Sequence, residues 1–95
     1  MLVNRVLDQL RLEHEQRGRT GLFLGLRPFL TEEPEAADYA RLGQQLGMQV
    51  GALKVALHRT RRRFGELLRN EVAHTVSSPE EIEEELRHLL AAIAD

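Results

Sequence analysis

Residues 39–64, YARLGQQLGMQVGALKVALHRTRRRF, constrain the fold more than any other part of the chain. Leu42 and Leu46 lie four residues apart, and a second apolar series recurs at three- and four-residue steps from position 53 to position 68. Each series has the spacing of one buried helix face. Gly47 stands between them, where a left-handed residue can end a helix without steric cost. The stretch therefore predicts two helices joined by a tight turn, the layout of a helix-turn-helix.

The second helix of this pair concentrates positive charge. Residues 51–70 hold six Lys or Arg against the single acid Glu66, a local balance of plus five in a chain whose net charge is −2. A local excess matters more than the net charge, because binding strength follows the number of phosphates that a basic surface reaches. The outward positions predicted to bind DNA are Lys54, Val55, His58, Arg59, Arg61, Arg62 and Arg63. With one Tyr, three Phe and no Trp, the chain is a poor stacking platform for single strands, so duplex DNA is expected.

The rest of the chain also shows helical periodicity. We expect an all-α bundle of about five helices, over residues 2–17, 20–30, 38–46, 50–72 and 79–94, with an acidic linker at 31–37. Pro28 predicts a kink or an early end in the second helix, because proline removes a backbone donor. Asp38 is the expected N-cap of the third helix, and Ser78 that of the last. The fourth helix is either one rod or broken near Gly65.

Length and composition bound the possible functions. Ninety-five residues form one small domain, 1–95, with N-terminal helices at 1–30, the helix-turn-helix at 38–72 and an acidic helix at 78–95. The absence of cysteine excludes disulfides and thiolate metal sites and is compatible with a reducing cytoplasm. No apolar run approaches the ~20 residues that span a bilayer. We expect a cytoplasmic protein that does not enter a membrane.

The sequence offers no signature of catalysis. His14 and Glu15 begin like a helical zinc-protease motif, but position 18 is Gly where that motif needs a second histidine. The four histidines share no helical face, and no phosphate loop, nucleophile elbow or acid pair stands out. We therefore expect no enzyme activity, no metal and no cofactor.

The helix-turn-helix stretch resembles region 4, the C-terminal domain, of bacterial extracytoplasmic-function RNA polymerase sigma factors. In that family an aromatic-led helix precedes the patterns L-G-M/I-S-x-G-T/A-V-K/R and L-x-R-A/L-R-x-x-L/F. The positions that fit are Leu46, Gly47, Met48, Gly51, Ala52, Leu53, Lys54, Leu57, His58, Arg59, Arg61 and Arg63. The flanks VLDQLRLEHEQRG, LRPFL, ELLRNEVAHTV and EEELRHLLAA are similar to a subgroup of these factors, so the likeness spans nearly the whole chain. Gln49 and Val50 depart from it, standing where the family has Ser and an acidic residue.

The resemblance implies the DNA-binding module of a sigma factor. It would place the second helix in the major groove of the upstream, minus thirty-five promoter element, and another face on the flap of the RNA polymerase beta subunit. By family analogy Lys54, Val55, His58 and Arg59 lie nearest the bases, while Arg61, Arg62 and Arg63 neutralise phosphates. Arg59 ranks first for base reading, because a guanidinium can bind a guanine edge through two parallel bonds. The family's N-terminal domain is missing, so the chain would be an excised fragment or a truncated relative.

Two other functions stay open. A stand-alone helix-turn-helix regulator would need its own dimer interface and would bind DNA without polymerase. A helical protein-interaction module would turn its basic face toward an acidic partner, such as an anti-sigma factor. Sedimentation of the free chain together with a polymerase pull-down separates the first alternative from the sigma-factor hypothesis.

Overall fold

The computed structural model describes residues 2–74 and 79–94, which form five α-helices, one short 3-10 helix and no strand. The helices are α1 (Leu2–Gln16), α2 (Thr20–Leu26), η1 (Arg27–Leu30), α3 (Ala36–Leu46), α4 (Val50–Ala73) and α5 (Pro79–Ala94). The prediction of an all-α fold with about five helices is confirmed for these residues.

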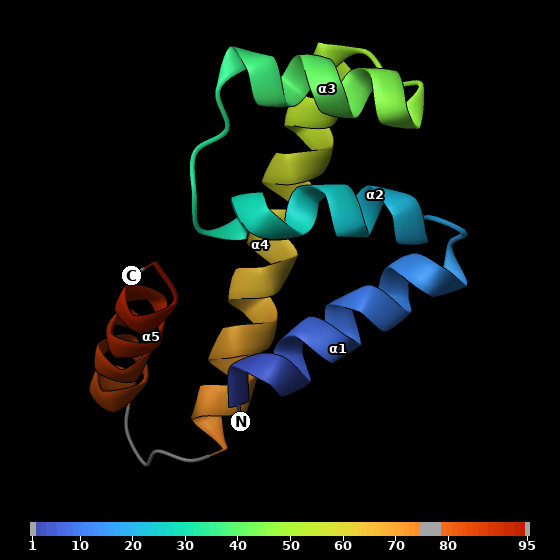
Figure 1. Cartoon of the computed structure of the whole chain (residues 1–95). Coiled ribbons are helices and arrows are strands. Elements are labelled where there is room, and N and C mark those ends of the chain that lie inside the picture. Colours follow the sequence, from blue (N-terminus) through green and yellow to red (C-terminus); the bar gives the residue numbers. More distant parts are fainter. Residues whose placement is uncertain (1, 75–78, 95) are drawn as a thin grey trace.

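Helix α4 is the axis of the fold (Figure 1). It continues unbroken through Gly65, so the fourth helix is one rod rather than two pieces. Gly65 is exposed, and a Cβ at that position would meet nothing within 4 Å. One glycine inside a helix costs about 1 kcal/mol. Its neighbours Phe64 and Leu68 are buried, and burying a side chain of this size gains about 1.5 to 3 kcal/mol, which keeps the helix intact.

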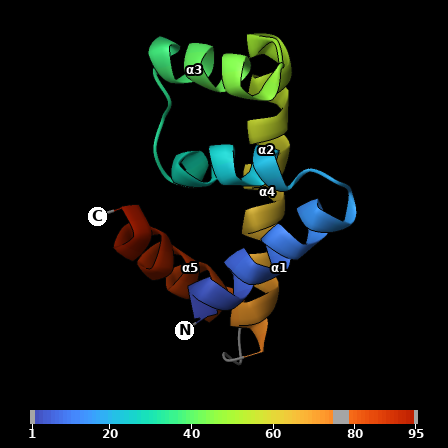
Figure 2. The same ribbon diagram turned by 45° about the vertical axis from the view of Figure 1, so that its right-hand side comes forward.

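The other helices pack along this rod at successive levels. In Figure 1, α3 crosses its N-terminal end, α2 crosses its middle and α1 crosses lower down. Figures 1 and 2 both place α5 beside the C-terminal half of α4, and the two helices are in contact. Each half of α4 is therefore packed against its own set of helices.

Two apolar clusters hold this arrangement together. The first joins α1, α2, α5 and the C-terminal half of α4 through Val3, Val6, Leu10, Phe23, Phe64, Leu68, Val72 and Leu86. The second joins α2, η1, α3 and the N-terminal half of α4 through Leu26, Phe29, Leu42, Leu53 and Leu57. Because α4 contributes to both clusters, its orientation is fixed along most of its length.

The helix boundaries confirm some predictions and correct others. Gly18, just past the end of α1, has a positive φ of 69°, as expected of a residue that stops a helix. The second helix ends at Leu26 and continues as the 3-10 turn that contains Pro28, so the predicted early end is confirmed. The predicted start of the third helix is wrong by two residues. Glu35 is the N-cap, and its backbone N–H donates to the Asp38 carboxylate at 2.9 Å, so Asp38 closes a capping box instead of opening the helix.

The last helix begins at Pro79, in agreement with the predicted range. Ser78, its predicted N-cap, lies outside the described residues. On the described part of α5, Leu86 is buried against α4, while Ile82 and Leu89 pack at the edge of the same cluster. The acidic side chains at positions 80, 81 and 83–85 are exposed, and Glu83 pairs with Arg69 of α4.

Candidate nucleic-acid interface

A three-residue turn, residues 47–49, joins α3 to α4 and sets the direction in which α4 leaves. Gly47 adopts a left-handed conformation with φ 65° and ψ 34°. The backbone N–H groups of Gly47 and Met48 both donate to the carbonyl of Gly43, the second at 3.0 Å. A Cβ built on Gly43 would lie 2.7 Å from the carbonyl oxygen of Met48, closer than real Cβ atoms come. The turn therefore needs glycine at both positions, although the sequence singles out only Gly47 as a helix end.

The N-terminal half of α4 presents one exposed face. Its inward side chains Leu53, Leu57 and Thr60 are buried. Five of the seven predicted contact residues lie on the exposed side: Lys54, Val55, His58, Arg59 and Arg62. Val55 is 49% exposed. We call this surface the α4 face.

Arg61 does not belong to the α4 face, so the prediction that it points outward is wrong. Its Nε donates to the carbonyl of Phe29 at 2.9 Å, and its Nη2 donates to the carbonyl of Glu32 at 2.8 Å. Its Nη1 also lies 3.4 Å from the Glu33 carboxylate. The guanidinium thus ties the segment between η1 and α3 to the middle of α4. Helical spacing could not reveal this role, because the partners lie about thirty positions away in sequence.

Arg63 is also engaged inside the molecule, although its side chain stays 43% exposed. Its Nε and Nη2 donate to the two carboxylate oxygens of Glu13 at 3.0 and 2.8 Å, and its Nη1 donates to Glu66 at 3.1 Å. The bidentate bond from Arg63 lowers the pKa of the Glu13 carboxyl below its ordinary value. The two carboxylates raise the pKa of Arg63 further above its usual range. This network joins α1 to α4 and engages all three guanidinium nitrogens of Arg63.

The cations that remain on the α4 face are much less engaged. Lys54 lies 5.4 Å from the centre of the Tyr39 ring, a weak cation–π contact. Arg62 lies 3.8 Å from Glu66, and since both side chains are more than half exposed, water screens this pair. Arg59 and His58 make no hydrogen bond or ion pair with any part of the chain that the structure describes. The side chains of Lys54, His58, Arg59 and Arg62 are thus available on the α4 face to contact a partner.

The start of α4 adds partial positive charge to the same region. Gln49 is the N-cap in an extended conformation (φ −76°, ψ 152°), but its side chain makes no capping bond. The first turn of α4 contains no acidic residue. The orphan N–H groups and the positive end of the helix dipole are therefore not neutralised by a side chain.

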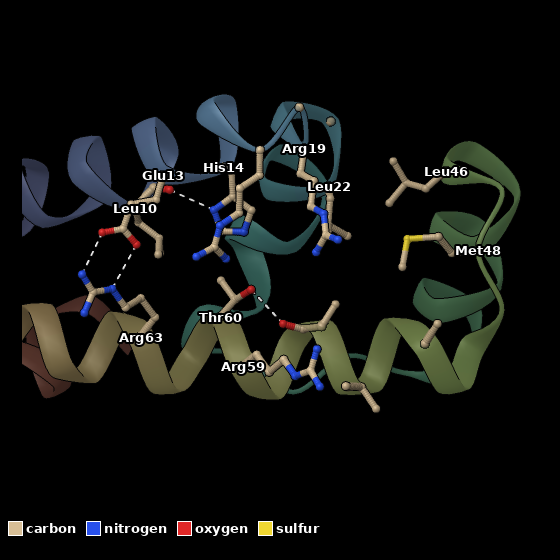
Figure 3. Close-up of a pocket in the computed structure, with 16 residues that line it drawn as sticks. Leu10, Glu13, His14, Arg19, Leu22, Leu46, Met48, Arg59, Thr60 and Arg63 are labelled. Atoms are coloured by element: carbon tan, nitrogen blue, oxygen red, sulfur yellow. Dashed lines mark hydrogen bonds and ion pairs between the residues drawn. The ribbon is translucent and has the colours of Figure 1, made fainter.

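Clefts flank the α4 face on both sides. One, of about 850 Å³, lies between α4 and the α1–α2 turn, and its lining includes Val55 and Arg59 (Figure 3). The other, of about 520 Å³, lies toward the start of α3 and is lined in part by Tyr39, Lys54 and His58. The α4 face is thus a ridge between two hollows, a shape that can enter a groove.

Residues 2–74 and 79–94 contain no group of three or more His, Cys, Asp or Glu side chains placed to hold a metal ion. In the same ranges no helix combines the length and the apolar character needed to cross a bilayer.

Comparison of the chain with protein-family models, with curated protein sequences and with solved structures finds no match in any of the three.

Proposed function

We propose that the chain is a DNA-binding module in which α3 and α4 form a helix-turn-helix and the α4 face enters the major groove. The observation that carries this proposal is the contrast among the basic residues of α4. Arg61 and Arg63 make internal hydrogen bonds, whereas Lys54, Arg59 and Arg62 stay on one exposed face. Cations without a folding role are the ones available to phosphates and bases.

The dimensions support this orientation. A helix with its side chains is about 10 to 12 Å across, and the major groove of B-DNA is about 12 Å wide. The ridge between the two clefts leaves the flanks of α4 open to the phosphate backbones that border such a groove. The positive end of α4 would add attraction to a nearby phosphate.

The exposed residues fall into different proposed roles. Arg59 is the first candidate for a base contact, since its guanidinium is free to form two parallel bonds to guanine. Val55 can contact a thymine methyl but cannot donate a hydrogen bond. Lys54 and His58 lie on the adjoining flank, and Arg62, further from the start of the helix, is assigned to a phosphate.

The resemblance to sigma-factor region 4 gives the proposal a biological setting. In that setting the module recognises the upstream, minus thirty-five promoter element, and another face docks on the flap of the RNA polymerase beta subunit. A single helix-turn-helix makes a small interface, so the free chain would bind weakly and lose affinity steeply with salt. Polymerase would tighten the complex by tethering the module beside its site.

Arg59→Ala, Arg62→Ala and the control Arg69→Ala test the assignment of roles. Arg69 lies on the same helix but pairs with Glu83 of α5, away from the α4 face. Duplexes selected from a random pool by the chain with polymerase would serve in competition binding. We expect Arg59→Ala to weaken the free energy of binding to the selected duplex by about 1 to 3 kcal/mol and to reduce the preference for one base pair. Arg62→Ala should weaken all sequences equally and reduce the salt slope by about 0.9.

Several results would contradict the proposal. If Arg69→Ala weakened binding as much as Arg62→Ala, the α4 face would not be the contact surface. If Arg59→Ala left base preference unaltered, Arg59 would not read a base. Tight, sequence-specific binding by a dimer without polymerase would favour the stand-alone regulator. Binding to an acidic protein without any affinity for duplex DNA would favour the interaction module.

A further inference from the structure

The turn between α1 and α2 carries two arginines that face α4. Arg17 and Arg19 flank Gly18, whose positive φ of 69° reverses the chain at this point. Both arginines are exposed, and both line the 850 Å³ cleft whose opposite wall contains Arg59. Figure 3 shows Arg19 pointing from the turn toward α4, with Arg59 on the facing helix. Two elements far apart in sequence thus place cations around one opening.

The positive charge of this cleft is only partly compensated from within, because its one acid, Glu13, is bonded to Arg63 and interacts with Arg17 through charge attraction alone. The side chains of Arg17, Arg19 and Arg59 make no hydrogen bond or ion pair with the described part of the chain. Glu13 is the acid in the lining of the cleft, and both its oxygens accept hydrogen bonds from Arg63. Glu13 is therefore already paired with Arg63, and three guanidinium groups stay available at the mouth of the cleft.

We infer that the α1–α2 turn is a second DNA-contacting element, which binds the phosphodiester backbone of the strand that passes the Arg59 flank of α4. The inference rests on the proposed function, because it assumes that the α4 face lies in the major groove. A helix that fills this groove brings a phosphate backbone against each flank. On one flank the strand would pass between Arg59 and the arginines of the turn.

The opposite flank of α4 does not offer an equivalent clamp. Its cleft contains the carboxylate of Glu33, and the guanidinium of Arg61 there is held by backbone carbonyls. That lining contains Lys54 and Arg61, and of these two cations only Lys54 is exposed. The two flanks would therefore contribute unequally to phosphate binding, and the α1–α2 turn would hold the more strongly bound strand.

The test is the double variant Arg17→Gln and Arg19→Gln in the full chain, compared with Arg5→Gln and Arg11→Gln. Glutamine removes the charge and keeps much of the side-chain length. Arg5 and Arg11 are exposed on α1 and outside the cleft, so the control changes the net charge equally. Affinity for a fluorescent duplex of arbitrary sequence would be measured at several salt concentrations, and circular dichroism would verify that both variants keep their helices.

We expect the turn variant to reduce the slope of log affinity against log salt by about 1.8, for two lost phosphate contacts. At 0.1 M salt this corresponds to up to roughly 60-fold weaker binding, equal for all sequences. The α1 control should change the slope little. A turn variant that behaves like the α1 control would overturn the inference, and the cleft would then be a candidate for an acidic peptide instead.

Failure of the inference and failure of the proposed function give different results. If wild-type protein binds duplex and Arg62→Ala weakens it while the turn variant does not, only the inference fails. If wild-type protein binds no duplex at any salt concentration, both fail.

A second readout uses the absence of cysteine from the chain. An iron chelate attached to Gln16→Cys, beside the turn, should cleave one DNA strand near the bound module. The same chelate on Asn4→Cys should not, and cleavage from both or from neither would count against the inference.

Discussion

Replacing Gly43 by alanine should destabilise the protein, although the same change in a helix is normally favourable. Gly43 lies inside α3, where alanine usually gains up to about 1 kcal/mol because it restricts the unfolded chain more than glycine does. Here the added Cβ would lie 2.7 Å from the backbone oxygen of Met48. The obstacle is backbone, which cannot rotate away, so the 47–49 turn must shift.

The size of the effect follows from these opposing terms. Overpacking of this kind costs about 1 to 3 kcal/mol. After subtraction of the normal gain, we expect Gly43→Ala to lower the free energy of unfolding by up to about 2 kcal/mol. For a domain of this size that lowers Tm by up to roughly 16 °C.

Gly65→Ala is the matched control, because it makes the same chemical change in a helix where the Cβ meets nothing within 4 Å. We expect it to raise the free energy of unfolding by about 0.5 to 1 kcal/mol. Urea titration and thermal melting followed by circular dichroism would measure both variants. The reasoning is refuted if Gly43→Ala stabilises the protein as much as Gly65→Ala does, since the tight turn after α3 would then not be present.

Substitutions at three further positions test other parts of the fold. Arg61→Ala should lower the free energy of unfolding by about 2 kcal/mol in urea titration, because two backbone carbonyls lose a charged donor; Arg61→Lys should not restore it. Glu13→Gln should lower the free energy of unfolding by about 1 kcal/mol at pH 7. Arg63 lowers the pKa of Glu13 in the folded protein, so their bond stabilises the fold fully above the ordinary carboxyl pKa of about 4.5. This stabilisation is lost as the pH falls through the lowered pKa of the folded state. The free energies of unfolding of wild type and variant should therefore converge in acid. Gln49→Ser should raise Tm, with a gain of about 0.5 to 1 kcal/mol, by supplying the missing cap of α4; an unchanged Tm would show that the cap position is misjudged.

The sequence was most informative where local chemistry decides the structure. Gly47 and Gly18 mark helix ends because the left-handed conformation favours glycine, and Pro28 ends a helix because it lacks an N–H. The buried stripe of α4 followed from its spacing alone. The start of α3 was misplaced because Asp38 can serve equally as an N-cap or as the N3 acid of a capping box, and composition does not distinguish these roles.

The candidate site was less predictable, because it depends on which cations find partners elsewhere in the fold. Helical spacing places Arg61 and Arg63 beside the α4 face, but their acceptors belong to η1, α1 and the segment before α3. The same reasoning overlooked Arg17 and Arg19, which join the cleft only once α1 and α2 fold against α4. The sequence signal that could have indicated them is the pair of arginines that flanks Gly18, the glycine that ends α1.

The central claim is that the α4 face binds duplex DNA, and NMR mapping of the full chain tests it most directly. Backbone amide shifts would be followed as a duplex is added at low salt, with the amides of α5 as an internal reference. We expect the largest changes over residues 50–62 and in the 47–49 turn, and little change over residues 80–92. Changes centred on α5, or none at a DNA concentration where anisotropy reports binding, would contradict the account.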